Sequence, residues 1–548
     1  MITSLLQQAI FLHQKGKLAE AAALYGNLLA HDPRHGDALN LLGVIELQRR
    51  NLPAALQLID RAVGIDPNNA AYLSNRGVAL HDLKRFGDAL ASYDRALAIR
   101  PDNPEVLNNR GTTLRELKRF ADALASYERA LAIKPDYPEA LNNRGNALRD
   151  LMRFDDALAS YERALAVKPD YEEARRNYAQ AYNRLANVLA GQGKLAEAIA
   201  RYERALAIKP DYLESHMNLG RILRSQGKLD KAIEHYRRAS AIMPGYVDAH
   251  LNLGEVFLDQ GRVSEALQEG ETAARLDDGA SFAHFPLGVL FARCNRKEDA
   301  RRHLLGYLEQ DPGDSRGARL ILARLGTDPI PDRASPSHLR NLYADRAKGW
   351  GGADTTYRGH ELARAAIEKL CADAADLDVL DAGCGTGLVG LKLRDIARRL
   401  DGVDFTPAML EKAKQTRAYD GLYEGDLVEF LAAHPSSYDV VVSAATLIHF
   451  GDLEPVFLAA AACLRDNGWF VFTLFPNDDE QRGQEVSVGP LGGLGEGGCY
   501  VHGRDYVCRL AKKTGFSVAL METGVHEYDN RGRPIQGLIA GLRREAAV

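Results

Sequence analysis

The stretch VLDAGCGTGLVG, residues 379–390, runs from an apolar segment into three glycines at every second position, Gly383, Gly385 and Gly387. The apolar segment LDVLDA, residues 377–382, predicts a buried strand, and the glycines predict the turn that ends it. Because glycine has no Cβ, a ligand can approach the backbone of this turn closely. The ligand could be a phosphate, a dinucleotide or another cofactor that carries adenosine.

The residues after this turn alternate between strand and helix patterns. We expect strands at residues 400–405, 438–447 and 468–476, and helices at residues 388–400, 406–416 and 453–465. Thr406 is expected to cap the second helix, with Pro407 at its first position. This alternation predicts a parallel sheet covered by helices on both faces.

The spacing of the glycines separates the three kinds of ligand. A mononucleotide phosphate loop needs Gly-Lys-Ser/Thr, but Gly387 is followed by Leu388 and Val389. A dinucleotide site needs GxGxxG, and here Leu388 stands where the third glycine belongs. The tighter GxGxG, preceded by Asp381 at the end of the strand, resembles motif I of class I S-adenosylmethionine-dependent methyltransferases.

Two further elements extend this resemblance. Asp404 lies 17 residues after Gly387 at the end of the second strand, where the resemblance implies that it accepts both ribose hydroxyls. That spacing alone would also suit a nicotinamide cofactor. In YEGDLVEF, residues 423–430, the resemblance implies that Asp426 takes the adenine amino group and that a neighbouring backbone N–H takes a ring nitrogen. The implied cofactor-binding residues are Asp381, Gly383, Gly385, Gly387, Asp404, Phe405, Asp426 and Leu427.

The resemblance covers about residues 338–548. The segments 443–457, 497–516 and 530–545 resemble, in order, the blocks that follow the fourth strand in such methyltransferases, and the last two would form a helix and a closing antiparallel hairpin. Residues 338–370 resemble the N-terminal helical segment that covers the cofactor. Tyr343, Tyr357 and Trp350 would either line this cover or serve packing alone.

Two histidines are candidates for a general base. Methyl transfer needs alignment and exclusion of water, and it needs a base only when the acceptor is a hydroxyl or a protonated nitrogen. His449 follows the fourth strand, at the edge of the sheet where ligands bind, and His502 follows a glycine-rich run. Each histidine could instead be a helix cap or a surface residue. The run 488–498 predicts a mobile lid that becomes ordered when the acceptor binds.

The first 320 residues repeat one pattern. Alanines recur every 34 residues, except for one longer step, at Ala21, Ala55, Ala89, Ala123, Ala157, Ala198, Ala232, Ala266 and Ala300. A glycine lies twelve residues before most of them and a proline twelve residues after, so each unit predicts two closely crossing helices ended by proline. Tyrosines such as Tyr93 would fill the space between neighbouring units. The pattern resembles nine tetratricopeptide repeats over about residues 2–315, which implies an all-α superhelix.

One step in this pattern is longer than the others. Ala157 and Ala198 are 41 residues apart, seven more than the usual spacing, and seven residues make about two turns of helix. The intervening residues contain no proline or glycine between Tyr171 and Gly191. We therefore expect one extra-long helix that starts near Tyr171, rather than a bulging loop.

Asparagines recur two residues before the glycine of several repeats. They are Asn75, Asn109, Asn143, Asn218 and Asn252. In peptide-binding tetratricopeptide domains such asparagines line the concave groove, so the resemblance implies a groove for a protein or peptide partner. The alternative is that asparagine is simply common at this position.

The join between the two regions is rich in proline. Residues 324–338, RLGTDPIPDRASPSH, predict a stiff, extended linker, and residues 315–325 predict a helix that caps the last repeat. We therefore expect a repeat domain at 1–325, a linker at 326–337 and a Rossmann-like α/β methyltransferase domain at 338–548.

Bulk composition limits the other partners. A net charge of −5 on 548 residues gives no reason to expect nucleic acid or a membrane surface as a partner. The six cysteines form no CxxC pair, which argues against a metal site or disulfides and favours the cytoplasm. We expect no signal peptide, because the N-terminal stretch has no basic start, no long apolar run and no small-residue cleavage site, and we expect no membrane span, because no apolar stretch is long enough.

Together these patterns predict an S-adenosyl-L-methionine-dependent methyltransferase joined to a repeat array. The array would recruit a protein, which could itself be the acceptor, or would scaffold or oligomerise an enzyme that acts on a small metabolite or sugar-like molecule. The alternative is a non-catalytic adaptor whose C-terminal domain senses the cofactor or is a relic.

Overall fold

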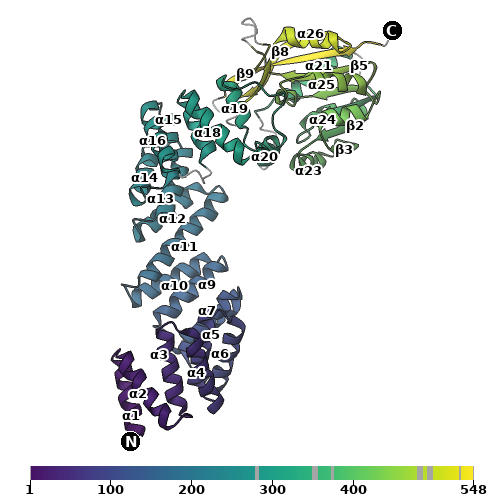
Figure 1. Ribbon diagram of the computed structural model, residues 1–548. Coiled ribbons are helices and arrows are strands. Elements are labelled where there is room, and N and C mark those ends of the chain that lie inside the picture. Colours follow the sequence, from purple (N-terminus) through teal and green to yellow (C-terminus); the bar gives the residue numbers. More distant parts are fainter. Residues whose placement is uncertain are drawn as a thin grey trace. The chain divides into compact units, whose positions relative to one another are not determined.

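The computed structural model describes residues 2–277, 283–347, 356–371, 375–477, 485–489, 498–529 and 532–546. The chain forms two compact units, residues 1–244 and 245–548 (Figure 1). Among the described residues, no helix is both long enough and apolar enough to span a bilayer.

The first unit consists of antiparallel helix pairs in sequence order. Its described helices are α1 Ile2–Gln14, α2 Leu18–His31, α3 Gly36–Gln48, α4 Leu52–Ile65, α5 Ala70–Asp82, α6 Phe86–Ile99, α7 Pro104–Glu116, α8 Phe120–Ile133, α9 Pro138–Asp150, α10 Phe154–Val167, α11 Glu172–Gly191, α12 Leu195–Ile208, α13 Leu213–Ser225 and α14 Leu229–Ile242. The two helices of each pair pack against each other, and the second helix of a pair packs against the first helix of the following pair, as in stacked repeats.

A glycine and a tyrosine set the close approach within a repeat. A Cβ on Gly77 of α5 would lie 2.4 Å from the ring of Tyr93 in α6, so only glycine leaves room for the buried tyrosine. Tyr93 also shares an apolar cluster with Val106 and Leu107 of the next repeat. The tyrosine therefore joins the two helices of its own repeat and the neighbouring repeat.

The extra-long helix is confirmed. Helix α11 has 20 residues and begins at Glu172, whereas α9 and α13 have 13 residues each. The seven additional residues extend the helix, because nothing between Tyr171 and Gly191 interrupts it.

The second unit begins with more helices. Its first helices are α15 Val247–Asp259, α16 Val263–Leu276, α17 His284–Arg293, α18 Lys297–Gln310, α19 Ala318–Leu325, α20 Pro336–Ala347 and α21 Gly359–Leu370. Helix α19 packs on α18 and α17, as expected for a helix that caps the last repeat.

A seven-stranded sheet forms the rest of this unit. Its strands are β1 Leu377–Ala382, β2 Ala397–Asp404, β3 Gly421–Glu424, β4 Tyr438–Ser443, β5 Leu464–Leu474, β8 Phe516–Tyr528 and β9 Pro534–Arg544, in the order β3-β2-β1-β4-β5-β9-β8. The first five strands are parallel, and β9 runs antiparallel to β5 and β8. A second sheet pairs β6 Val486–Gly489 with β7 Cys499–His502.

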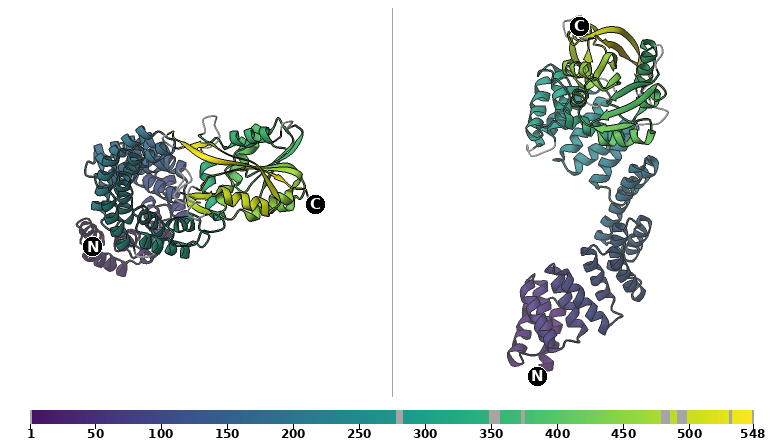
Figure 2. Two further views of the ribbon diagram at one scale, coloured as in Figure 1. Left: turned by 90° about the horizontal axis from the view of Figure 1, so that it is seen from above. Right: turned by 90° about the vertical axis from the view of Figure 1, so that its right-hand side faces the viewer.

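Helices cover both faces of the large sheet (Figure 2). One face carries α21 and α22 Leu388–Leu393, and the other carries α24 Leu427–Ala433, α25 Glu454–Cys463 and α26 Arg504–Lys513. The remaining helices are α23 Pro407–Thr416 and the short η1 Leu447–His449. The expected fold classes, an all-α repeat array and a Rossmann-like α/β domain, are confirmed.

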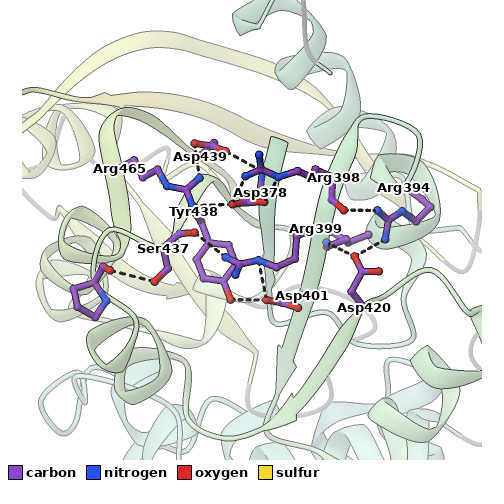
Figure 3. Close-up of polar contacts among 12 residues, drawn as sticks. Asp378, Arg394, Arg398, Arg399, Asp401, Asp420, Ser437, Tyr438, Asp439 and Arg465 are labelled. Atoms are coloured by element: carbon purple, nitrogen blue, oxygen red, sulfur yellow. Dashed lines mark hydrogen bonds and ion pairs between the residues drawn. The ribbon is translucent and has the colours of Figure 1, made fainter. Parts of the chain in front are cut away.

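The helix expected at 388–400 is too long. Helix α22 ends at Leu393, and β2 begins at Ala397, three residues before the expected start of the strand. Arg398 makes a two-pronged ion pair with Asp378 on the neighbouring β1, at 2.7 and 3.1 Å (Figure 3). Arg398 and Arg399 therefore lie in β2 at the amino edge of the sheet, although the sequence pattern around them also fits a helix.

Candidate functional site

The glycine turn lies at the carboxyl end of β1. Gly383, Gly385 and Gly387 all have positive φ, between 52° and 89°, a region that suits glycine. A Cβ on Gly383 would lie 2.0 Å from the side-chain oxygen of Thr446, which follows β4. A Cβ on Gly385 would meet nothing within 4 Å. Gly383 is therefore fixed by packing, whereas the backbone at Gly385 faces open space.

A pocket opens beside this turn, at the point where the strand order reverses between β1 and β4. In open α/β sheets ligands bind at such a point. The pocket is lined by Arg333, Ala334, Pro336, Leu339, Tyr343, Tyr357, Gly383, Cys384, Gly385, Thr386, Leu388, Val389, Val403, Asp404, Phe405, Thr406, Met409, Gly425, Asp426, Leu427, Ala444, Ala445, Thr446, His449 and Phe450. Six of the eight expected cofactor-binding residues line it, while Asp381 and Gly387 lie behind the lining.

Asp404 ends β2 and faces the turn. Its Oδ2 accepts a hydrogen bond from the backbone N–H of Gly385 at 3.0 Å, and its Oδ1 accepts one from Thr406 at 2.8 Å. Burial raises the pKa of this carboxyl group. Each oxygen retains acceptor capacity, so the carboxylate suits a ligand with two adjacent hydroxyl groups.

Asp381 is buried at the end of β1. Its Oδ2 accepts a hydrogen bond from the Tyr419 hydroxyl at 2.6 Å, and among the described residues its Oδ1 has no hydrogen-bond partner. Burial raises the pKa of Asp381 to about 7. Tyr419 was not predicted from the sequence. Gly390 indicates its place, because a Cβ at Gly390 would lie 2.3 Å from the Tyr419 ring.

Asp426 accepts hydrogen bonds from three groups of the protein itself. Its Oδ1 caps α24 by accepting from the N–H groups of Val428 and Glu429, at 3.0 and 3.3 Å. Its Oδ2 accepts a hydrogen bond from Arg333 at 2.8 Å. Arg333 could not be predicted as a partner of Asp426 from the sequence, because it lies 93 residues away in a segment whose composition indicates a linker.

His449 lies in the pocket beside an aromatic residue. Its Nε2 lies 2.6 Å from the hydroxyl of Tyr343, and the two rings meet edge to face. Burial lowers the pKa of His449 to about 3, so its ring is neutral near pH 7. Tyr357 also lines the pocket, and Trp350 lies outside the described residues.

His502 does not join this group. It is buried in β7, stacks on Tyr506 and is absent from the pocket lining, although β7 packs against η1, which carries His449. The expectation that it contacts a substrate therefore has no geometric support here. Most of the run 488–498, where a lid is expected, lies outside the described residues.

The recurring asparagines make bonds of their own. The Asn75 and Asn143 side chains each donate to an asparagine of the preceding repeat, Asn40 and Asn108, at 3.0 Å. Asn218 donates to Asn187 at 3.1 Å, and Asn252 donates to a backbone carbonyl of its own helix. No such side-chain bond is recorded within the described residues for Asn109. Asn75, Asn143 and Asn218 therefore also serve the packing between repeats.

Among the described residues, no three histidine, cysteine or carboxylate side chains gather in a way that could hold a metal ion.

Comparison with protein families matches residues 355–520 to a methyltransferase domain. Tetratricopeptide repeat models match residues 6–70, 68–136, 136–211 and 189–234, and a TPR repeat model matches residues 220–261.

Individual relatives match the C-terminal region. The chain is 30% identical over 161 residues to a "Probable S-adenosylmethionine-dependent methyltransferase" of Mycolicibacterium smegmatis, covering 29% of this chain and 61% of that protein. It is 29% identical over 149 residues to the ubiquinone biosynthesis O-methyltransferase of Albidiferax ferrireducens, covering 26% and 58%. The chain thus spans about three fifths of these curated relatives. A solved S-adenosylmethionine-dependent methyltransferase from Methanosarcina mazei is similar with a TM-score of 0.27 and 15% identity, covering 31% of this chain and 94% of that one.

Proposed function

We propose that this chain, which carries tetratricopeptide repeats followed by a methyltransferase domain, is an enzyme that transfers a methyl group from S-adenosyl-L-methionine. This cofactor is the one that the domain family implies. The observation that carries the proposal is a single pocket that combines the open backbone at Gly385 with the carboxylates of Asp404 and Asp426.

The residues fit the chemical groups of this cofactor. Asp404 would hold the two ribose hydroxyls, and Asp426, beside Leu427 and Phe405, would accept from the adenine amino group. Asp381 lies behind the pocket lining, and among the described residues its Oδ1 has no hydrogen-bond partner, so its carboxylate would attract the positively charged amino group of the methionine part through the wall of the pocket. When bound, the cofactor supplies an electrophilic methyl group on a sulfonium.

His449 and Tyr343 are the groups that would handle a proton of the acceptor. The hydrogen bond between Tyr343 and His449 would let either residue contact the acceptor. Because burial lowers the pKa of His449 to about 3, its ring would take up a proton only if the bound acceptor stabilised the charged imidazole. The aromatic side chains of Tyr343 and Tyr357 would also exclude water from the transfer.

The repeat array would bind a protein or peptide partner in the cytoplasm. The asparagines at 75, 109, 143, 218 and 252 recur at one position of the repeats and would line its groove, and the array could also hold copies of the chain together. Helical repeats offer broad surfaces that suit proteins better than small molecules. The acceptor would then be a side chain on the bound protein or, if the array only scaffolds, a small molecule.

Calorimetry tests the cofactor site directly. S-adenosyl-L-homocysteine is titrated into the full chain, into Asp404→Ala and into the control Asp395→Ala, whose exposed carboxylate pairs with Arg364 outside the pocket. Wild type and the control should bind equally, and Asp404→Ala should bind at least ten-fold more weakly. If wild type binds nothing at millimolar ligand, the C-terminal domain is a relic and the chain is an adaptor.

A labelling experiment then identifies the acceptor class. A lysate is incubated with the chain and a radioactive methyl donor, and the label is separated into protein and small molecules. Label that depends on Asp404 and travels with protein supports recruitment by the array. Label that travels with small molecules supports a metabolite acceptor.

A further inference from the structure

The segment expected to be a linker lies along the methyltransferase domain. The N–H of Ala334 donates to the carbonyl of His449 at 2.8 Å, and the N–H groups of Gly451 and Asp452 both donate to the carbonyl of Asp332, at 2.7 and 2.9 Å. Arg333 also forms an antiparallel bridge with Phe450. These bonds fix the backbone of the segment against the loop that follows β4.

The other side of the segment is held as well. The hydroxyl of Tyr500 in β7 donates to the carbonyl of Pro331 at 2.8 Å. Leu320 of α19, Ala334, Val488 of β6 and Tyr500 form one buried apolar cluster. The segment is therefore clamped between the β6–β7 hairpin and the loop after β4, and the capping helix of the repeats contributes to the clamp.

This clamped segment forms a wall of the pocket. Arg333, Ala334 and Pro336 all line it. The backbone on both sides of Arg333 is hydrogen-bonded to the domain, and this holds the Arg333 side chain at the rim of the pocket. There its guanidinium donates to Asp426 Oδ2 at 2.8 Å.

The bonds to Asp426 determine what remains for a ligand. Two backbone N–H groups occupy Oδ1 and one guanidinium N–H occupies Oδ2. A carboxylate has about four acceptor positions, so one position remains, on Oδ2. The guanidinium and the helix terminus together prevent the carboxylate from rotating, and this leaves the free position oriented before any ligand arrives.

We propose that Arg333 is a positioning residue of the adenine subsite, which it orients by holding Asp426, and that the segment at 331–336 completes the cofactor pocket. This inference rests on the proposed function, because it concerns the adenine end of that cofactor. The methyltransferase domain expected to begin at residue 338 would thus lack part of its own binding site.

The test is calorimetry on the full chain with two ligands. The first is S-adenosyl-L-homocysteine, and the second is S-inosyl-L-homocysteine, which carries an oxygen in place of the amino group that Asp426 would accept from. The side chains of Arg333 and Asp426 are 47% and 27% exposed, so we expect Arg333→Ala to weaken binding of the adenosyl ligand by about 3- to 5-fold. Binding of the inosyl ligand should not change.

Three further variants exclude a general loss of structure. Arg333→Lys should recover part of the affinity, and Arg333→Ala should have no further effect once Asp426→Asn is present. Arg319→Ala is the matched control, because Arg319 is 46% exposed, pairs with Asp314 and lies on α19 outside the pocket. It should bind both ligands like wild type.

The outcomes separate the two proposals. If wild type binds neither ligand, the proposed function fails and this inference falls with it. If wild type binds but Arg333→Ala is unchanged, or weakens both ligands equally, only the positioning role is wrong. Tighter binding by Arg333→Ala would mean that Arg333 competes with adenine, and this would overturn the inference as well.

Discussion

At the scale of single residues, the pocket depends on carboxyl groups in unusual surroundings. Asp381 is buried, and its only recorded side-chain partner among the described residues is the Tyr419 hydroxyl. Asp404 is also buried but accepts two backbone hydrogen bonds. The two aspartates therefore differ in how many hydrogen bonds stabilise their ionised form, and we expect their protonation to respond differently to a ligand and to pH.

The first prediction concerns the pH dependence of binding. Because the pKa of Asp381 is raised to about 7, the group stabilises the unliganded fold below its unfolded pKa, and that contribution is lost as the pH rises through about 7. A positively charged ligand amino group favours the ionised form, so the affinity for S-adenosyl-L-homocysteine should increase as the pH rises from 6 to 8. Calorimetry in two buffers of different ionisation enthalpy should also detect proton release. Asp381→Asn should show neither effect, and a flat wild-type profile would contradict the assignment.

A second prediction concerns the turn within each repeat. In every repeat, the residue five positions before the recurring alanine has positive φ. These residues are Gly16, Arg50, Lys84, Lys118, Met152, Gly193, Gly227, Gly261 and Asn295. Met152 is 60% exposed, so its side chain contributes little packing. Met152→Gly should raise the free energy of unfolding by about 0.5–1 kcal/mol, because it relieves a left-handed conformation. Urea denaturation measures this, and Gly227→Ala should change stability in the opposite direction.

At the scale of elements, ion pairs and hydrogen bonds join neighbouring strands at the amino edge of the sheet. Asp378 accepts from Arg398 of β2 and from Arg465 of β5, and its own backbone N–H donates to Asp439 of β4 (Figure 3). Four strands are thereby aligned at one edge, opposite the pocket.

The third prediction follows from this network. Asp378→Ala should lower the free energy of unfolding by about 2 kcal/mol, less than for a fully buried pair, because both arginines are partly exposed. The hydrogen bond from Arg398 lowers the pKa of Asp378 to about 2. Its contribution is therefore present above pH 4 and is lost as the pH falls towards 2. Urea denaturation at pH 7 and pH 3 should show the difference between wild type and variant shrinking at the lower pH.

The sequence predicted most elements because their signals are local. The repeats, the long α11 and the glycine turn each follow from residues that are neighbours in the chain, and so do Asp404 and Asp426. The boundary between α22 and β2 and the bond between Arg333 and Asp426 depend on contacts across the fold. The place of His502 in β7, outside the pocket lining, also depends on contacts across the fold, because it is set by the pairing of β6 with β7.

At the scale of the whole molecule, the structure joins the last repeats, the capping helix and the methyltransferase domain in one compact unit, residues 245–548. A ligand that stabilises this unit should also stabilise the segment clamped at 331–336.

The fourth prediction tests this link by hydrogen exchange. Binding of S-adenosyl-L-homocysteine should slow amide exchange at residues 331–336 and in the loop after β4, because their backbones are bonded to each other. Peptides from residues 1–244 should exchange at an unchanged rate and serve as the internal control. Protection around the glycine turn without protection at 331–336 would show that the segment is not part of the site.

Helix α11 also has a consequence for how the chain reaches its native state. Several repeats are near copies, so during folding one of them can stack on the wrong copy and still bury its apolar face. The 20-residue α11 differs from every other described repeat helix in length, and a misaligned neighbour would leave two of its turns unmatched. We therefore expect the longer α11 to disfavour the stacking of near-identical repeats in the wrong order during folding.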